Sequence, residues 1–307
     1  MPSYSIVVVT WQSAGHLAAL AASMNRHLGD EPELVVVDNA SDDDPGPVAE
    51  AWRGPTRVIG LEANRGYGAA ANVGVAEAEG DAVVTLNPDT ELLDAGLGNL
   101  AAFALERCAL VGPRLRNPDG SPQPSASGPP VGAWPWVGAV VPGALAPRPL
   151  RARTEPWRLD DAVRVAWLTG ACVAGPRDAL LELGPFDPAL EMYGEDLDLG
   201  LRAGRAGIES WFCPATATVL HHGGASSALR YEDGPAPVIA LTRRAVVKRA
   251  YGATRERRGW LAQRLNLRLR IIAMQALGRN AERERIALAA ALSAARPPEL
   301  PAAPRRA

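Results

Sequence analysis

The stretch Val83-Val84-Thr85-Leu86-Asn87-Pro88-Asp89-Thr90-Glu91 decides the fold of this chain. Its first four residues are apolar or β-branched, and they run directly into an Asn-Pro-Asp turn. A short continuous run of this kind predicts a strand buried on both faces, as in the interior of a parallel sheet. The turn then sets the Asp89 carboxylate at the carboxyl end of a central strand, where such sheets bind ligands. Asp89 is therefore either a ligand for a hard cation or an ordinary loop acid.

Strands and helices alternate along the chain before this stretch. Three further buried strands are predicted, at residues 5–10, 33–38 and 57–59. Helices are predicted between the strands, at 16–28, at 48–52 and, after an Asn-Arg-Gly segment at 64–66, up to residue 79. This alternation predicts an α/β fold with a doubly wound, mainly parallel sheet that binds its ligand at the strand ends.

The second half of the chain is less regular. An apolar segment at 109–111 is followed by a predicted strand at 167–174, a helix at 177–183 and a strand at 209–212. Residues 117–156 form a long insertion rich in Pro, Gly and Ser, in which Trp134 and Trp136 are embedded. Because long loops in compact domains are usually functional or mobile, these aromatic residues either line an acceptor groove or pack within a variable insertion.

Three units are expected along the chain. Residues 1–232 form the α/β domain, 233–295 a basic helical extension, and 296–307 a disordered tail rich in Pro. Between Arg243 and Arg285, twelve Arg and one Lys face three Glu, although the formal net charge of the whole chain is -2. That extension either docks on an anionic membrane surface or packs as a helix with solvated Arg side chains.

Composition excludes several classes of partner and location. The net charge of -2 gives no reason to expect nucleic acid. Three widely spaced cysteines predict buried free thiols in a reducing compartment. The chain opens without a signal peptide and holds no apolar run of the roughly 18 residues that a membrane span needs. We therefore expect a cytoplasmic protein, soluble or bound peripherally at the inner face of the membrane.

Four groups of polar residues carry the candidate chemistry. Asp38 ends the second strand, where it either accepts the N–H of a pyrimidine base or caps its own loop. The turn at Asn87–Asp89 offers oxygen ligands to Mg²⁺ or Mn²⁺, which need only one or two protein carboxylates when substrate phosphates and water complete the shell. His221 and His222 precede a Gly-Gly turn; they are either structural or supply a neutral imidazole to the same metal.

The fourth group is the acidic cluster Glu195, Asp196 and Asp198, at the predicted start of a helix that runs to residue 206. The helix dipole favours ionised acids there and would keep Asp196 deprotonated, as a general base must be. Helix capping explains acids at this position equally well. Within the helix, Leu197 and Leu201 should face the core, and Asp198 can pair with Arg202 four residues on.

These groups occur in the order that is typical of one family. The chain resembles the inverting family 2 glycosyltransferases with a GT-A fold, and within them the bacterial rhamnosyltransferase-like branch. The resemblance rests on matching stretches that span most of residues 5–227: SIVVVTW at 5–11, VVVDNASDD at 35–43, NRGYGAAANVG at 64–74, LNPDTEL at 86–92, WLTGACVA at 167–174, GPFDPALEMYGEDLDLGLRAGRAG at 184–207 and VLHHGGASS at 219–227.

The resemblance implies a role for each matched residue. Asp38 would hold the nucleotide base beside the backbone of Thr10 and Trp11, and Asn64, Arg65 and Gly66 would lie against the diphosphate. Asp89 and His221 would bind a divalent cation, Mg²⁺ or Mn²⁺. Asn87 stands where the family's Asp-x-Asp motif begins with Asp, which removes one negative charge from the metal site. Asp196 would be the catalytic base, with acceptor-side or supporting roles for four neighbours: Tyr193, Glu195, Arg202 and His222.

The implied reaction is sugar transfer with inversion. The donor would be dTDP-β-L-rhamnose, or alternatively a UDP-sugar such as UDP-galactose, UDP-glucose or UDP-GlcNAc, and the acceptor a surface-glycan or lipid-linked precursor. A homodimer is compatible with the family.

A non-catalytic glycan-binding relative stays open because of Asn87. A dinucleotide-binding oxidoreductase is disfavoured because Gly66-Tyr67-Gly68 follows the third strand and not the first. A nucleotidyltransferase is disfavoured because the first strand leads into Trp11-Gln12-Ser13, without a Gly-rich phosphate loop.

Overall fold

The computed structural model describes residues 3–141, 146–223, 234–293 and 297–302. A mixed sheet of eight strands crosses the molecule, in the order β3 (Thr56–Gly60), β2 (Glu33–Asp38), β1 (Tyr4–Thr10), β4 (Ala82–Leu86), β11 (Cys172–Pro176), β6 (Leu110–Gly112), β12 (Ser210–Phe212) and β9 (Val163–Val165). β1 to β4 run parallel, β11 runs antiparallel to both its neighbours, and β12 is parallel to β6 but antiparallel to β9. The expected doubly wound, mainly parallel sheet is confirmed.

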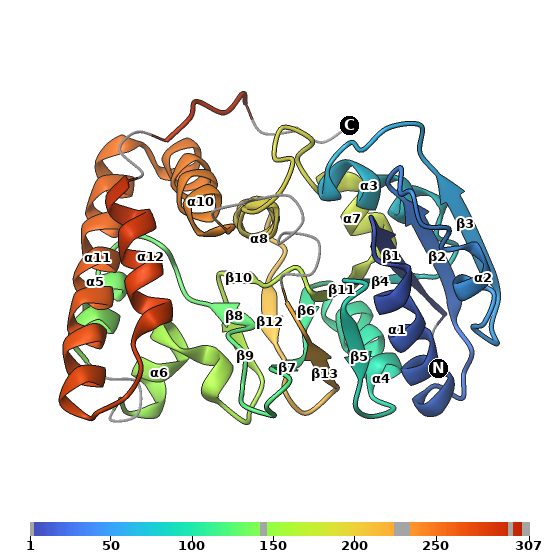
Figure 1. Ribbon diagram of the computed structural model, residues 1–307, viewed down its shortest axis with the longest axis horizontal. Helices are drawn as coiled ribbons and strands as arrows, with labels where there is room; N and C mark the ends of the chain where they lie inside the picture. The colour runs from blue at the N-terminus through green and yellow to red at the C-terminus, as the bar shows by residue number, and fades with distance from the viewer. Residues whose placement is uncertain (1–2, 142–145, 224–233, 294–296, 303–307) are drawn as a thin grey trace.

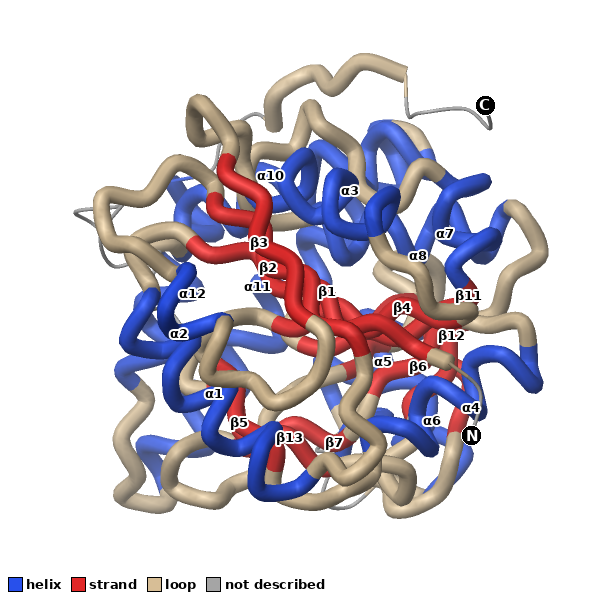
Figure 2. The backbone as a smooth tube through the Cα atoms, turned by 90° about the vertical axis from the view of Figure 1, so that its right-hand side faces the viewer, coloured by secondary structure: helices blue, strands red, loops and turns tan. Residues whose placement is uncertain are grey.

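Helices cover both faces of this sheet (Figure 2). α1 (Ala14–His27) and α4 (Leu97–Arg107) pack on one face, and α3 (Tyr67–Glu77), α7 (Arg177–Leu183) and α8 (Glu195–Arg205) on the other, while the short α2 (Gly46–Ala49) joins β2 to β3. Alternate residues of β1 enter the two cores: Ile6 and Val8 contact the α1 side, and Val7 and Val9 the α3 side. All five residues of β4 are buried, as expected for a strand covered on both faces.

Two small sheets lie next to the large one. β13 (Thr218–His221) runs antiparallel to β5 (Thr90–Leu92) and parallel to β7 (Arg114–Arg116). The other small sheet consists of two antiparallel strands, β8 (Ala126–Ser127) and β10 (Trp167–Leu168). The register of the first sheet sets His221 opposite Thr90, so a residue near the end of the α/β domain is fixed beside the turn that follows β4.

The C-terminal helices and the insertion together form the side of the molecule away from β1–β3 (Figure 1). α10 (Ala236–Tyr251), α11 (Ala253–Ala276) and α12 (Glu282–Ser293) pack on one another. α11 also packs against α5 (Trp134–Val140), which contacts α6 (Arg148–Thr154), and a 3-10 turn follows at Pro156–Arg158. Asn266 of α11 donates a hydrogen bond to the Gly138 carbonyl of α5 at 2.6 Å. The insertion is thus held by helices that follow it by more than a hundred residues.

α10 is joined to the α/β domain through α8. Leu197 and Leu201 of α8, Trp167 of β10, and Val246 and Val247 of α10 form one buried apolar cluster. The expectation that both leucines face the core is confirmed. α8 is therefore packed between the main sheet and the C-terminal helices.

Three sequence predictions need correction. The strand expected at 167–174 is divided into β10 and β11, because the chain turns at 169–171 and the two pieces join different sheets. The insertion expected as a loop contains α5 and α6. Cys172 and Cys213 are buried free thiols, but Cys108 is exposed because it ends α4 with a left-handed φ of 47°.

The tail is partly ordered by contacts with α10. Residues 294–296 and 303–307, within or next to the segment expected to be disordered, lie outside the described residues, as does Gly224 of the Gly-Gly turn. Residues 297–302 have no regular secondary structure, but Leu300 packs against the α8–α10 cluster and the Pro301 carbonyl accepts a hydrogen bond from Arg249 at 3.0 Å. Within the described part of the chain, no helix is both long enough and apolar enough to cross a bilayer.

Candidate active site

A pocket of about 260 Å³ opens at the carboxyl ends of β1 and β4, next to the point where the sheet order changes direction. This is the place at which open α/β sheets bind ligands. Eight of the residues predicted from sequence line it: Trp11, Asn64, Gly66, Asn87, Asp89, Tyr193, Glu195 and Asp196. His221 also lines it, so the predicted metal residues and the predicted base share one cavity.

Asp89 and His221 meet because β5 and β13 are paired. The Nε2 atom of His221 lies 3.4 Å from Oδ1 of Asp89, and both side chains are largely buried. Burial alone would raise the pKa of Asp89, but the hydrogen bond and charge of His221, with a smaller effect of His16, lower the pKa below its usual value. Asp89 is therefore ionised at neutral pH and presents a carboxylate to the pocket.

Gln123 from the insertion fixes the orientation of His221. Its Nε2 amide donates to the His221 carbonyl at 3.2 Å and to Oδ1 of Asn117 at 2.9 Å, so its Oε1 faces Nδ1 of His221 at 2.8 Å as an acceptor. When the ring is neutral, this arrangement places its one proton on Nδ1 and leaves the Nε2 lone pair to accept from Nδ2 of Asn87 at 3.4 Å; the hydrogen bond and charge that lower the pKa of Asp89 belong to the ring with a proton on Nε2 as well. A hydrogen bond that sets the tautomer of a histidine in this way is typical of metal-ligating histidines.

The acidic cluster begins α8 after two residues in left-handed conformation. Tyr193 has a φ of 68° and Gly194 a φ of 86°, and a non-glycine residue in this region is strained. The reversal directs Glu195 and Asp196 into the pocket. Oδ1 of Asp196 accepts the Leu197 N–H at 2.7 Å, whereas Oδ2 is held only by a 3.4 Å contact with the Gly170 N–H. Oδ2 is thus the oxygen that is more available to a substrate.

Burial governs the charge of this carboxylate pair. It raises the pKa of Asp196, and the positive charge of Arg243 and backbone N–H donors oppose the rise. Burial and the neighbouring charge of Asp196 raise the pKa of Glu195 to about 8. Removal from water therefore opposes the helix dipole that was expected to keep Asp196 ionised. A carboxylate with a raised pKa is a stronger base once ionised.

Two buried polar atoms at this end of the pocket lack partners among the described residues. They are Oε2 of Glu195 and Nε of Arg243. Arg243, from α10, lies with its guanidinium 4.9 Å from the ring centre of Trp167. Because buried polar atoms are normally hydrogen-bonded, these two are where a ligand has most to gain by binding.

On the nucleotide side, Asn39 reaches the pocket where Asp38 was expected. Oδ1 of Asn39 accepts the Arg65 N–H at 2.9 Å, and its Nδ2 donates to Oδ1 of Asn64 at 3.0 Å. The carboxylate of Asp38 accepts the Ser41 N–H at 3.2 Å, which matches the loop-capping alternative. Thr10 is fully buried, with Oγ1 2.8 Å from Oγ of Ser13. Asp38, Thr10 and Arg65 do not line the pocket.

Gly66 is fixed by a close approach of backbone. It has a φ of 80°, and an added Cβ would lie 2.5 Å from the Glu191 carbonyl oxygen. The next residue, Tyr67, donates its N–H to that same carbonyl at 3.1 Å. Only glycine can hold the 64–66 segment against the loop that leads to Asp196.

Two residues expected near the acceptor lie elsewhere. Arg202 is buried below α8: it pairs with Asp198 at 2.6 Å, as the four-residue spacing predicted, and it donates to the carbonyls of Leu183, Gly184 and Pro185. His222 lies outside the pocket, with Nε2 2.8 Å from Oε1 of Glu91. Arg202 is therefore part of the scaffold, and His221 is the histidine that faces the cavity.

A further network ties α10 to this scaffold. Arg249 contacts Oδ2 of Asp187 at 2.6 Å and Oδ1 of Asp198 at 2.7 Å. Together with Arg202, it neutralises two buried carboxylates. The helix that carries Asp196 is thus held from both sides by arginine.

Sequence reasoning missed several residues of the site. They come from the insertion, from the turn between β10 and β11, from the loop before α8 and from α10: Gln123, Thr169, Gly170, Ala171, Glu191, Met192, Ile239 and Arg243. Asn39 and Tyr67 also line the pocket; like residues 169–171, Glu191 and Met192, they stood within motifs that had been recognised. For Gln123 and Arg243 no local pattern distinguishes the residue from its neighbours, because each is brought to the site by long-range packing.

Comparison with known proteins agrees with this geometry. A family model described as "Glycosyl transferase family 2" matches residues 5–167. The chain is also 36% identical, over 233 residues, to the N-acetylglucosaminyl-diphospho-decaprenol L-rhamnosyltransferase of Mycobacterium tuberculosis, a match that covers 71% of this chain and 75% of that protein. The chain belongs to glycosyl transferase family 2. The family expected from the motifs is confirmed, and with it glycosyltransferase activity.

Other matches are weaker or show the fold alone. The O-antigen biosynthesis protein RfbC of Myxococcus xanthus is 30% identical over 199 residues, which cover 63% of this chain but 15% of that protein. The mannosyltransferase PcManGT from Pyrobaculum calidifontis, solved with GDP-Man and Mn²⁺, superposes with a TM-score of 0.57 at 15% identity, covering 96% of this chain and 86% of that one. S. aureus TarS 1–349 with UDP-GlcNAc gives 0.54 at 18% identity, covering 94% and 79%.

Proposed function

We propose that this glycosyltransferase moves L-rhamnose, with inversion, from dTDP-β-L-rhamnose to a hydroxyl group of a lipid-linked glycan precursor. The observation that carries the proposal is that Asp196, Asp89 and His221 line one pocket of about 260 Å³ at the strand ends. The choice of sugar and acceptor is supported by the 36% identity to the mycobacterial L-rhamnosyltransferase. A UDP-sugar is the alternative donor, because the same pyrimidine-binding position would accept uracil.

The residues at the turn after β4 fit a divalent cation. Asp89 supplies an ionised carboxylate, and His221 a lone pair on Nε2 that lies 3.4 Å from it. In the described ranges no cluster of three or more His, Cys, Asp or Glu side chains could hold a metal alone, so water and the donor's diphosphate would complete the shell, as is usual for Mg²⁺. Such a cation would stabilise the negative charge that develops on the leaving diphosphate.

The chain's own side chains account for the remaining steps. Oδ2 of Asp196 takes the proton from the acceptor hydroxyl. The hydroxyl oxygen forms a bond to the anomeric carbon from the face opposite the diphosphate, and the carbon–oxygen bond to the diphosphate breaks with its electron pair, which inverts the configuration. Asn39, Asn64 and Gly66 position the donor on the nucleotide side. The neutral form of Glu195, favoured by its raised pKa, limits repulsion of the anionic donor.

The basic extension fits contact with a membrane that carries the acceptor. α11 packs against α5 and α12, and on its free side Leu261, Leu269 and Ile272 are exposed among arginines. We infer peripheral docking of this face on the anionic inner surface of the cytoplasmic membrane.

Substitution of the base tests the reaction. Asp196→Asn should lower kcat for transfer about a thousandfold, because a general base contributes roughly 10²–10⁴ in rate. The thermal shift produced by the donor should persist, since Asp196 lies on the acceptor side. Transfer at the wild-type rate in both Asp196→Asn and Asp196→Ala would remove Asp196 from this role.

A thermal-shift screen with Mn²⁺ and dTDP-, UDP- and GDP-sugars tests the donor. We expect stabilisation by dTDP-rhamnose above the others. A shift with UDP-sugars alone would replace the donor but keep the mechanism, and a shift with GDP-sugars alone would contradict binding of a pyrimidine nucleotide on the Asn39 and Asn64 side of the pocket.

A further inference from the structure

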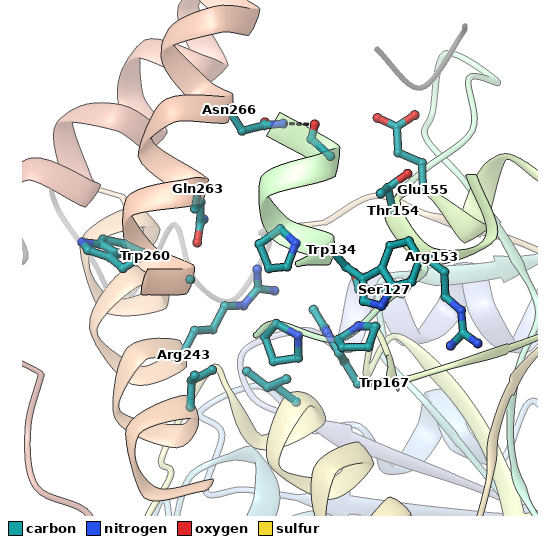
Figure 3. A pocket seen from close by; sticks show the side chains of 18 of the residues that line it. Ser127, Trp134, Arg153, Thr154, Glu155, Trp167, Arg243, Trp260, Gln263 and Asn266 are labelled. Carbon is teal, nitrogen blue, oxygen red and sulfur yellow. Dashed lines mark hydrogen bonds between the residues drawn. The ribbon is translucent and has the colours of Figure 1, made fainter. Parts of the chain in front are cut away.

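A second and larger pocket, of about 390 Å³, lies between the insertion and the C-terminal helices (Figure 3). Arg243 lines both this pocket and the active-site pocket. Leu197, which follows Asp196 directly, also lines the second pocket. A ligand in the second pocket can therefore extend to the catalytic carboxylate without crossing the donor site.

The walls of this pocket are unusually rich in tryptophan. Four of the eight tryptophans of the chain line it: Trp134, Trp157, Trp167 and Trp260. Each has an arginine guanidinium 4.2 to 5.9 Å from its ring centre. Flat aromatic faces bind sugar rings and apolar chains, and paired arginines add affinity for anions. The combination suits a ligand that is both amphipathic and negatively charged.

The charges of the pocket do not cancel. Glu256 is paired with Arg244 at 2.5 Å, Glu155 with Arg158 at 2.6 Å, and Arg270 with Glu284 at 3.0 Å. Of the lining arginines, Arg153 and Arg243 form no ion pair with any residue that the structure describes.

Arg243 in particular requires an acceptor. Its Nε atom is buried and has no hydrogen-bond partner among the described residues, and its side chain extends into the middle of the pocket (Figure 3). A buried donor without a partner costs free energy unless a ligand or water supplies an oxygen. Although the charge of Arg243 acts on Asp196 and Glu195, its Nε donor has no partner among the described residues, and Arg153 also has no ion pair there. Guanidinium donors of this kind favour a ligand with several anionic oxygens, such as a diphosphate.

We propose that this pocket is the acceptor site and that it binds a glycosyl diphosphate attached to an apolar chain. The acceptor sugar lies at the junction next to Asp196, the diphosphate contacts Arg243 and Arg153, and the beginning of the apolar chain lies on Trp134 and its neighbours. This inference rests on the proposed function, because it assigns a place and a chemical class to that function's acceptor. It adds a diphosphate-binding site separate from the one that holds the donor.

Two variants with matched controls test the site. Arg153→Gln removes an unpaired cation, and its control is Arg148→Gln on the same helix, where Arg148 pairs with Asp161 outside the pocket. Trp134→Ala removes an aromatic wall, and its control is Trp136→Ala on the same helix, where the side chain is exposed and does not line the pocket. None of the four residues contacts the donor pocket, so donor-induced thermal shifts should stay at the wild-type value.

The probes are N-acetylglucosaminyl diphosphate on a short isoprenoid chain and an uncharged alkyl N-acetylglucosaminide. Calorimetry gives the Kd of each without donor, and transfer kinetics give the KM of each. Arg153→Gln should raise Kd and KM for the diphosphate probe about tenfold and change those of the uncharged probe less than twofold. Trp134→Ala should raise both constants about tenfold for both probes, while the two controls change them less than twofold.

The outcomes separate the two proposals. Wild-type protein that does not bind the diphosphate probe, or variants that bind it as the controls do, would overturn the acceptor site. Binding that follows the expected pattern without sugar transfer would retain the site and refute the proposed function. A loss of equal size in Arg148→Gln or Trp136→Ala would point to general damage of the insertion and would also overturn the assignment.

Discussion

The two walls of the catalytic cavity are built in different ways. The donor wall consists of the ends of β1, β2 and β4 and of the turns that follow them, so hydrogen-bonded register fixes its residues. The acceptor wall consists of α10, α11 and the insertion, which meet through side-chain packing and the hydrogen bond from Asn266 to the Gly138 carbonyl. In the first wall a residue's position follows from its place in a strand, whereas in the second it depends on contacts between segments far apart in the sequence. We expect substitutions in the donor wall to abolish transfer and those in the acceptor wall to tune it.

The largest effect should come from Asp89, whose pair with His221 lies beside a second acid–histidine pair, Glu91 with His222, where β5 and β13 meet. Asp89 and His221 have side chains that are 8% and 13% exposed and face the pocket, whereas Glu91 and His222 are 29% and 37% exposed and lie outside it. Asp89→Ala should lower kcat/KM about a thousandfold, because a preorganised electrostatic group typically contributes 10²–10³. Glu91→Gln should leave kcat/KM within twofold in the same steady-state assay. Equal losses in both variants would show that the sheet, and not the pocket-facing pair, is responsible.

Arg249 links α10 to Asp187 and to Asp198 of α8, so its substitution tests whether the C-terminal helices stabilise the domain that carries the donor wall. Arg249→Met leaves the buried carboxylates of Asp187 and Asp198 partly uncompensated, which should lower the free energy of unfolding by about 3 kcal/mol. Urea denaturation measures this loss. Arg255→Met, at an exposed position of α11, serves as the control and should change it by less than about 0.5 kcal/mol. If Arg249→Met is as stable as the control, the C-terminal helices are not an integral part of the catalytic unit.

The donor wall could be predicted from sequence because local patterns determine it. The continuous apolar run at 83–86 predicted β4, and the turn after it predicted the position of Asp89. The exception is Asp38, where a strand end offers two adjacent polar residues: Asn39 reaches the pocket while Asp38 caps its loop. Which of two adjacent side chains faces the pocket depends on the backbone conformation at the strand end. The pattern of apolar residues in the sequence does not determine it.

The acceptor wall could not be predicted, for a physical reason. The Pro, Gly and Ser of the insertion suppressed the helical signal of α5 and α6. In the structure α5 packs against α11, and α6 packs against α5. Tertiary packing here overrides a weak local propensity. At Asp196 the sequence showed the favourable helix dipole but not the burial, which raises the pKa of this carboxyl against the dipole.

Gln123 is a residue of the insertion that contacts the donor wall, through its hydrogen bonds to His221. Gln123→Ala removes the acceptor for the Nδ1 proton of His221, so Mn²⁺ affinity should fall about tenfold, at the lower end of the 10–100-fold range for such supporting residues. Gln123→Glu keeps an acceptor oxygen and should restore most of the affinity. Mn²⁺ titration in the presence of a nucleoside diphosphate measures both variants. Equal affinity in Gln123→Ala and wild type would mean that His221 is oriented by β13 alone.

Arg243 lines both the acceptor pocket and the catalytic pocket. The pH dependence of sugar transfer shows whether its charge acts on Asp196. Its positive charge lowers the pKa of Asp196 against the rise caused by burial, so Arg243→Gln should raise that pKa. Because the base acts in its ionised form, activity is lost as the pH falls through its pKa, and the acidic limb of the kcat/KM profile should move to higher pH by about one unit. Arg153→Gln, which removes a cation from the acceptor wall but not from the environment of Asp196, should leave the limb in place. An unshifted limb in Arg243→Gln would show that Arg243 acts on the acceptor alone, whereas a shift in both variants would make the cavity one continuous electrostatic unit and remove the distinction between its walls.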